Sequence, residues 1–255
     1  MACPLRATMS RIFTEEELAF PLLRGRLLHA FAEAVALNVD SDVARLKIMD
    51  AYQEILAAPI WLRSHRLDTW RTVLDRTKMW IETHRHIFEQ VGVEVEAEVT
   101  IAEGMKLRGR IDRLEKTMDG DYHIVDFKSG TNSPSEKTIA DHVQLFTYQL
   151  ILHHGAFDGT KIRTARSTES GMTVDGATLV YPEKDTKNIW SITQAAKTEE
   201  QLAEFENQLP DLLQALRGPE LQAQRNPRCA TCKLKPICPV FDTGKWTTEP
   251  TTNVS

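Results

Sequence analysis

The sequence predicts a mixed α/β protein in which helices pack against a β-sheet. Residues from about 42 to 90 read as helical, and residues 91–101 alternate apolar and charged side chains as a strand does. Asp119-Gly120 separates two β-prone runs, which is the strongest short-range signal for a β-hairpin. These three observations together predict helices that cover a sheet of several strands.

The remaining elements follow in chain order. We expect further helices at about 21–37, 137–153 and 198–216, and further strands at 177–181 and 188–192. Pro21 suits the first position of the first of these helices, and Gly155 suits the end of the second. Pro210 is expected to interrupt or restart the third. The helical part offers these side chains to the core: Trp61, Leu67, Trp70, Val73, Leu74, Trp80 and Ile87.

The charge balance sets a limit on what the surface can bind. The 255 residues carry a net charge of −5, which is not the basic footprint of a nucleic-acid-binding protein. Any basic groove therefore has to be local, and Arg108, Arg110, Arg113 and the run 161–166 are the candidates. A solvated surface explains those charges equally well. The sequence contains no signal peptide and no apolar run long enough to span a membrane, which points to the cytoplasm.

The hairpin carries the candidate catalytic and metal-binding residues. Side chains alternate faces along a strand, so Asp126 and Lys128 share one face. Pairing that is symmetric about Asp119-Gly120 places Asp112 opposite or next to Asp126. A slip of one residue would turn Asp112 to the other face, so the register decides whether the two carboxylates meet.

Two carboxylates on one face of a hairpin suit a divalent metal. Magnesium prefers hard oxygen ligands, which Asp112, Asp126 and a backbone carbonyl such as that of Phe127 would supply. Lys128 would orient or deprotonate a water, or stabilise a pentacovalent phosphate as a cation. This is the arrangement that a magnesium-dependent phosphodiesterase needs. The alternative for this pattern alone is a surface hairpin with mixed charges.

The two strands, Gly109-Arg-Ile-Asp-Arg-Leu-Glu115 and Tyr122-His-Ile-Val-Asp-Phe-Lys-Ser-Gly130, resemble the catalytic core of the PD-(D/E)XK nuclease superfamily. More narrowly they resemble its RecB-like branch and the AddB-like iron–sulfur nuclease domains of helicase–nucleases. The resemblance implies a restriction-endonuclease-like core: a mixed β-sheet flanked by helices, with a helical insertion and a C-terminal cysteine-rich iron–sulfur clasp. It also implies Asp112 and Asp126 as metal ligands and Lys128 as the catalytic lysine.

Two helical segments extend the resemblance. Gly25-Arg-Leu-Leu-His29 matches a G-x-x-x-H segment of the RecB-like family, which implies His29 as a metal ligand or positioning residue. Gln144 and Tyr148 are four residues apart and share one helix face, matching the family's Q-x-x-x-Y helix. That match implies that they position the DNA backbone and support the catalytic residues. Ordinary packing is the alternative for His29, and a half-buried position in a mixed helix is the alternative for Tyr148.

The four cysteines form a split pattern. Cys229, Cys232 and Cys238 lie close together near the C-terminus, Pro239 follows the last of them, and Cys3 lies almost at the start. On ligand type alone, four thiolates suit a [4Fe–4S] cluster or a zinc ion equally well. The resemblance to AddB-like and CRISPR adaptation nucleases implies the iron–sulfur cluster, acting as a clasp. Relatives carry a segment before the first cysteine, so a trimmed, fragmentary or minimal domain is expected here.

The resemblance implies one nuclease domain over residues 1–246, followed by a disordered tail at 247–255. Its helical part would span about 40–90, its catalytic sheet about 91–195 and its cluster-binding segment about 221–240. The implied function is a Mg²⁺- or Mn²⁺-dependent deoxyribonuclease, an exonuclease acting on DNA ends or single strands in recombination and repair. The chain has no G-x-x-x-x-G-K-(S/T) phosphate loop, so a helicase partner is expected. The alternatives are a catalytically silent DNA-binding or scaffold module, and a CRISPR or defence nuclease.

Overall fold

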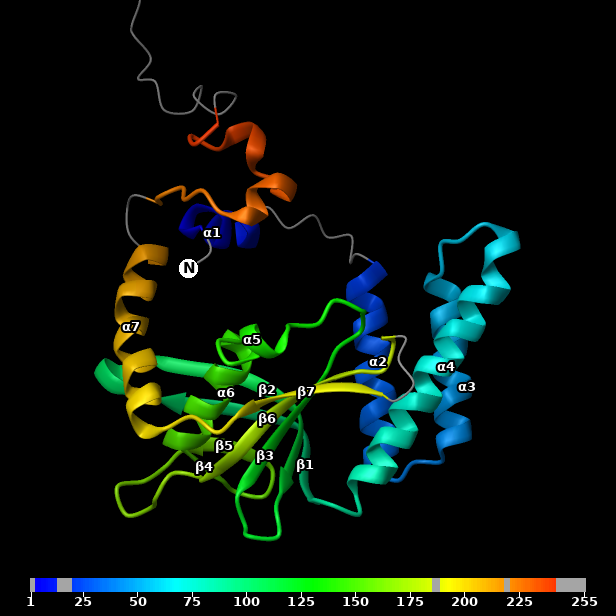
Figure 1. The fold of residues 1–255 in the computed structure, drawn as a ribbon, viewed down its shortest axis with the longest axis horizontal. Helices are drawn as coiled ribbons and strands as arrows, with labels where there is room; N and C mark the ends of the chain where they lie inside the picture. Colours follow the sequence, from blue (N-terminus) through cyan, green and yellow to red (C-terminus); the bar gives the residue numbers. More distant parts are fainter. Residues whose placement is uncertain (1–2, 13–19, 185–188, 218–220, 242–255) are drawn as a thin grey trace, which may run out of the picture. The chain divides into compact units, whose positions relative to one another are not determined.

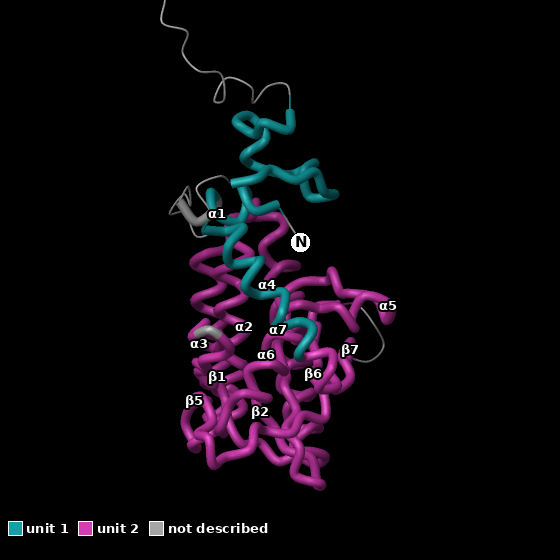
Figure 2. The backbone as a smooth tube through the Cα atoms, turned by 90° about the vertical axis from the view of Figure 1, so that its left-hand side faces the viewer, with its two compact units in different colours: residues 1–17, 203–255 teal, residues 18–202 magenta. Residues whose placement is uncertain are grey.

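The structure is a computed structural model that describes residues 3–12, 20–184, 189–217 and 221–241. The chain divides into two compact units, one formed by residues 18–202 and the other by residues 1–17 together with 203–255 (Figure 2). The expected tail at 247–255 lies outside the described residues. No helix among the described residues is long and apolar enough to cross a membrane.

A seven-stranded mixed sheet forms the centre of the larger unit (Figure 1). Its order is β4-β5-β1-β2-β3-β6-β7, and β1 pairs with β5, and β3 with β6, in parallel. The other neighbours are antiparallel. The strands are β1 Glu89–Thr100, β2 Lys106–Lys116, β3 Tyr122–Phe127, β4 Gly155–Phe157, β5 Lys161–Thr164, β6 Val174–Tyr181 and β7 Trp190–Ala195. The short 3-10 helix η1, Ala102–Gly104, joins β1 to β2.

Three helices pack together beside the sheet, as Figure 1 shows: α2 Phe20–Ala36, α3 Ser41–Ile55 and α4 Ile60–His84. Asp40 caps α3, because its Oδ1 accepts from the backbone N–H groups of Asp42 and Val43. Tyr52 stacks on Trp70 with 4.7 Å between ring centroids, and the helices share one apolar core with Val125 and Phe127 of β3. This core fixes α2 against the middle of the sheet.

The other side of β3 meets a different helix. α6, Val143–His154, follows the single-turn helix α5, Glu136–Ile139, and is mostly buried. Side chains alternate along a strand, so Val125 and Phe127 face the helical core while Asp126 faces α6, where Gln144 binds it. The expected mixed sheet flanked by helices is therefore confirmed.

The smaller unit joins the two ends of the chain. It contains α1 Pro4–Ile12, most of α7 Glu199–Arg217, and the short 3-10 helices η2 Pro227–Thr231 and η3 Lys235–Ile237. The backbone N–H of Leu5 donates to the carbonyl of Gln222 at 3.2 Å, and the Thr8 hydroxyl donates to the carbonyl of Leu216 at 3.2 Å. Segments more than 200 residues apart thus lie side by side.

Several expected elements differ from the structure in their bounds. The helical part breaks at residues 56–59, because Pro59 starts α4 and cannot continue α3. The helix expected at 137–153 is two helices, α5 and α6. Gly155 ends α6 as expected, but it has φ −103° and not a left-handed conformation, and it is also the first residue of β4. α7 passes through Pro210 without interruption. β4 and β5 were missed, because strands of three and four residues show too little alternation.

Two of the expected core side chains are exposed. Trp61 is 75% exposed and Ile87 is 56% exposed, whereas Trp70, Val73, Leu74 and Trp80 are buried as expected. Trp61 lies in the first turn of α4, before the helix reaches the core, and Ile87 follows the end of that helix. Helical periodicity cannot detect where a helix leaves its neighbours, so the end residues were assigned wrongly.

Candidate metal centre and active site

The hairpin turn sets the register of the two central strands. Its loop contains five residues, Thr117 to Asp121, and Gly120 has φ +94°, which favours glycine. Arg113 then pairs with Val125, so the next position along both strands places Asp112 beside Asp126. The Oδ2 atom of Asp112 accepts from the backbone N–H of Phe127 at 2.7 Å. Asp112 and Asp126 therefore occupy neighbouring positions on the two paired strands. The sequence alone did not decide this, because it did not fix the register of the hairpin.

A third carboxylate lies opposite Asp112 on the neighbouring strand. β1 pairs with β2 on both sides of Glu94, which has φ +48° and is one of two described non-glycine residues with positive φ. This conformation carries strain, and such strain concentrates at functional sites. The alternating pattern of β1 offers three glutamates, Glu94, Glu96 and Glu98. The alternation treats all three alike, and only the backbone conformation singles out Glu94.

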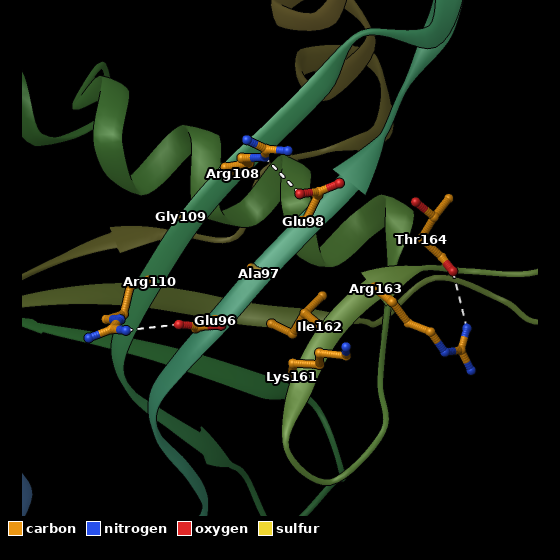
Figure 3. Close-up of a pocket in the computed structure, with 10 residues that line it drawn as sticks. All are labelled: Glu96, Ala97, Glu98, Arg108, Gly109, Arg110, Lys161, Ile162, Arg163 and Thr164. Carbon is orange, nitrogen blue, oxygen red and sulfur yellow. Dashed lines mark hydrogen bonds and ion pairs between the residues drawn. The ribbon is translucent and has the colours of Figure 1, made fainter.

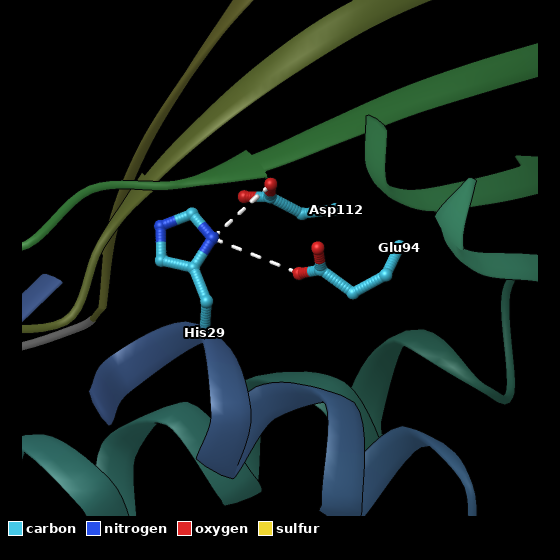
Figure 4. A group of neighbouring side chains, drawn as sticks. All are labelled: His29, Glu94 and Asp112. Carbon is cyan, nitrogen blue, oxygen red and sulfur yellow. Dashed lines mark ion pairs between the residues drawn. The ribbon is translucent and has the colours of Figure 1, made fainter. Parts of the chain in front are cut away.

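His29 of α2 completes a group of metal-ligating side chains (Figure 4). Its Nδ1 lies 3.2 Å from Asp112 Oδ1 and 3.8 Å from Glu94 Oε1, and all three ligand atoms lie within 4.8 Å of one another. Among the described residues this is the only such group of three or more ligands. α2, β1 and β2 each supply one member, so the group exists only in the folded chain.

His29 is held as a cation by its neighbours. Burial disfavours its charged form, but hydrogen bonds to Asp112 and Glu94 outweigh burial and raise the pKa of His29 to about 10. A proton on Nδ1 thus occupies the place where a metal ion would sit. Gly25 lies one turn earlier on α2, where a Cβ would approach Ser129 Oγ to 3.2 Å. The glycine lets α2 come close to the strand end that carries Lys128.

A hydrogen-bonded chain holds Lys128. Lys128 Nζ lies 2.5 Å from Asp126 Oδ2 and donates to Gln144 Oε1 at 2.8 Å. Gln144 Nε2 donates to Asp126 Oδ1 at 2.7 Å and contacts the Tyr148 hydroxyl at 3.1 Å. One amide of α6 therefore positions both the carboxylate and the ammonium.

Tyr148 anchors this chain to β2. Its hydroxyl donates to the carbonyl of Arg110 at 2.7 Å, and burial raises the pKa of Tyr148 to about 12, so it remains a donor. A Cβ on Gly109 would lie 2.8 Å from the Tyr148 ring, so only glycine allows this close approach. The shared helix face expected for Gln144 and Tyr148 is confirmed by their contact.

The carboxylate of Asp126 is buried next to a second carboxylate, and these surroundings favour the binding of a cation. Burial first, and then the neighbouring Asp112, raise the pKa of Asp126 to about 6, although Lys128 lowers it. Its Oδ2 atom has the ion pair with Lys128 but no hydrogen-bond partner. The group of mutually close ligand atoms contains the imidazole of His29 and the carboxylates of Glu94 and Asp112, but not that of Asp126. An imidazole with carboxylates matches the ligand preferences of Mn²⁺ and, through the oxygens, of Mg²⁺. The residues present therefore fit a divalent metal.

A family model described as the PD-(D/E)XK nuclease superfamily matches residues 1–239. This chain belongs to that superfamily. Membership implies a metal-dependent nuclease, which is a hydrolase. No curated protein matches the chain. One solved structure, titled "Crystal structure of SSO0001", is 15% identical and covers 93% of this chain and 94% of that chain, with a TM-score of 0.32.

The two exposed cations of β2 that the sequence predicts for a basic groove lie next to the site in this nuclease and form ion pairs with β1. Arg108 pairs with Glu98 at 2.7 Å, and Arg110 pairs with Glu96 at 2.9 Å (Figure 3). Arg110 also reaches Glu94 at 3.6 Å. The side chains of Arg108, Arg110, Glu96 and Glu98 line a hollow of about 660 Å³ together with residues of β5, among them Lys161 and Arg163. Four cations and two carboxylates line this hollow, so its lining is positive on balance.

Arg113, expected as a groove cation, is instead buried. Its side chain is 1% exposed and forms an ion pair with Glu115, whose other oxygen lies 3.4 Å from His84 Nδ1. Both faces of β2 are covered at this point, so a charge here has to be paired within the protein. The Arg113 assignment was therefore wrong.

The two ends of the nuclease chain lie next to each other at two of the cysteines, Cys3 and Cys229. All four cysteines are free thiols. Cys3 Sγ accepts from the backbone N–H of Gln224 at 3.3 Å, and the Cys229 thiol donates to the carbonyl of Gln224 at 3.9 Å. Cys229 Sγ also accepts from the N–H of Asn226 at 3.4 Å. An N-terminal and a C-terminal sulfur thus lie against one residue.

Proposed function

We propose that this chain is a Mg²⁺- or Mn²⁺-dependent deoxyribonuclease that acts as an exonuclease on DNA ends or single strands. The observation that carries the proposal is the meeting of His29, Glu94 and Asp112 beside the Asp126–Lys128 pair. Three carboxylates, one imidazole and one ammonium within one site supply metal ligands and a cation for a phosphate. An inactive scaffold would not need this complete set.

The metal ligands would be His29, Glu94, Asp112 and Asp126, with the Phe127 carbonyl as a further oxygen. When bound, the divalent ion stabilises negative charge on the scissile phosphate and lowers the pKa of water. Asp112 is fixed by the Phe127 amide, which leaves its other oxygen, Oδ1, on the His29 side. The protein therefore holds these carboxylates in place before any ligand arrives.

Lys128 supplies the positive charge of the reaction. Asp126 and Gln144 hold its Nζ atom from two sides, so the ammonium has little freedom to move away. In this position it stabilises the pentacovalent phosphate or orients the attacking water. Gln144 and Tyr148 act by positioning Asp126 and Lys128, and we propose that they also support the DNA backbone.

The cysteines are proposed to hold a [4Fe–4S] cluster as a clasp. Cys3 and Cys238 are buried, Cys3 and Cys229 both contact Gln224, and backbone N–H groups point at two of the sulfurs. Such N–H contacts stabilise thiolates that bind metal. Cys232 would complete the set. The cluster would hold the two ends of the chain together.

We further propose a role in recombination and repair with a helicase partner. A nuclease that acts on single strands needs a partner to unwind duplex DNA, and this sequence contains no G-x-x-x-x-G-K-(S/T) loop to bind the phosphates of ATP. A pull-down of the tagged protein from its own cells, followed by an ATPase assay, tests the partnership. Recovery of no helicase, with normal DNA cleavage by the isolated chain, would contradict it.

The nuclease proposal is tested with anaerobically purified protein. Labelled single- and double-stranded DNA, and RNA of the same sequence, are incubated with Mg²⁺ or Mn²⁺. Asp126→Ala and Lys128→Ala should each abolish DNA cleavage, whereas Asp119→Ala, an exposed aspartate on the same hairpin, should retain it. Cleavage that survives both substitutions, or cleavage of RNA alone, would refute the proposal. Iron and sulfide analysis tests the cluster, and stoichiometric zinc would refute it.

A further inference from the structure

The cysteine-rich segments have a charge opposite to that of the whole chain. Residues 3–12 and 221–241 contain six arginines and lysines and no aspartate or glutamate, although the net charge of the protein is −5. None of the ion pairs in the described part of the chain involves Arg6, Arg225, Arg228 or Lys235. Uncompensated cations gathered in two short segments favour an anionic partner.

Two of these cations converge on one aromatic ring. The guanidinium carbon of Arg225 lies 5.4 Å from the centroid of the Phe241 ring, and Lys235 Nζ lies 5.3 Å from the same centroid. A pocket of about 420 Å³ includes all three residues, and no carboxylate of the described residues lines it. Arg225 also donates to the carbonyl of Val240 at 3.2 Å, which fixes the guanidinium next to Phe241. Two like charges are thus held near one ring, with no carboxylate partner among residues 3–12, 20–184, 189–217 and 221–241.

The pairing of a ring with two cations indicates the chemistry of the ligand. An inorganic anion would use the cations but not the ring, and a duplex would hide the faces of its bases. A single strand presents phosphates to Arg225 and Lys235 and an unstacked base to Phe241. Arginine beside the ring strengthens such stacking through its own planar cation.

We infer that Arg225, Lys235 and Phe241 form a binding subsite for single-stranded DNA, separate in sequence and chemistry from the metal centre. The identity of the strand as substrate rests on the proposed nuclease function. The subsite itself rests only on the charges, the pocket and the ring. This subsite would give the segment 221–241 a role in substrate binding. The proposed cluster gives the cysteines of that segment a role in stability only.

Binding is measured by fluorescence anisotropy with a labelled oligothymidine in EDTA, so that cleavage cannot interfere. The double variant Arg225→Glu/Lys235→Glu should weaken binding at least about tenfold and reduce the slope of log K against log salt by about 1.4, which is two phosphate contacts. Phe241→Ala should weaken binding at least about fivefold, and Phe241→Trp should restore it, because base stacking needs an aromatic face.

The matched control is Lys47→Glu/Arg66→Glu, which changes the net charge equally through exposed cations of the other compact unit. It should change the affinity less than about threefold. Equal weakening by both double variants would show a net-charge effect and overturn the inference. Iron content and the thermal midpoint check folding, and Arg225→Gln/Lys235→Gln replaces the charge reversal if that variant misfolds.

The two proposals fail in different ways. Cleavage by the native protein, together with unchanged DNA binding by Arg225→Glu/Lys235→Glu and Phe241→Ala, would refute the subsite alone. Absence of cleavage, together with binding that depends on Arg225, Lys235 and Phe241, would refute the nuclease and retain the subsite. Asp126→Ala should lose cleavage and keep binding in EDTA, because it removes no part of the subsite.

Discussion

Glu94 allows a direct test of strain at the metal centre. Its φ of +48° lies in the left-handed region, where a Cβ costs about 1–2 kcal/mol. Glycine has no such cost, but it loses about 0.5–1 kcal/mol through backbone entropy in a strand. Glu94→Gly should therefore be more stable than Glu94→Ala, by up to about 1.5 kcal/mol. At most other strand positions the order is reversed.

Both variants remove the same carboxylate, so the difference between their free energies of unfolding reports the backbone conformation at residue 94. Urea midpoints in EDTA give the free energy of unfolding, and the thermal midpoint should differ by about 2–4 °C for 1 kcal/mol. Both variants should weaken Mn²⁺ binding at least about tenfold and lose DNA cleavage, since each lacks a proposed ligand. Glu94→Gln keeps the side-chain size and should behave as Glu94→Ala does in the metal-binding assay.

Two results would refute this reasoning. If Glu94→Gly is less stable than Glu94→Ala, the backbone at this position is not strained. If Glu94→Gly binds Mn²⁺ and cleaves DNA as the native protein does, the carboxylate is not a ligand and the site consists of His29, Asp112 and Asp126 alone. Stabilisation together with loss of activity would show that the chain sacrifices stability for a ligand position.

Three further predictions concern other parts of the molecule. Gly109→Ala should cost about 1–3 kcal/mol and lower cleavage, because its Cβ would displace Tyr148; unfolding curves like those of the native protein would contradict this. Mn²⁺ affinity should rise from pH 5 to 8, because the ion displaces the protons of Asp126, with a pKa of about 6, and of His29, with a pKa of about 10. Calorimetry in two buffers should show proton release on Mn²⁺ binding that decreases above pH 6. An affinity that does not change with pH would exclude both residues as ligands. Cys3→Ser should lower iron content and the thermal midpoint while leaving Mn²⁺ affinity within about twofold.

The hairpin was predictable because its signals are local. Asp119-Gly120 and the β-prone runs beside it predict two strands whatever the rest of the chain does, and β2 and β3 confirm them. The same locality explains α2, which begins and ends within one residue of its expected bounds. His29 and Gln144 were proposed through the resemblance of two short helical motifs to those of the RecB-like family.

The errors lie where distant packing decides. Trp61 reads as a core residue because α4 is helical around it, but its side chain lies in the first turn of that helix and is 75% exposed. Arg113 reads as a surface cation, and only the packing of α4 against β2 reveals its buried pairing with Glu115. Burial depends on which elements meet, and a periodic pattern within one element does not contain that information.

The sequence by itself determined the strand pair that carries Asp112, Asp126 and Lys128, together with the family to which the chain belongs. The tertiary structure decided that these carboxylates share one site, that Glu94 joins them, and that Gln144 holds both Asp126 and Lys128. The physical reason is that a metal site is defined by ångström distances between side chains of separate elements. Those distances follow from register, backbone conformation and helix packing, which arise only when the whole unit folds.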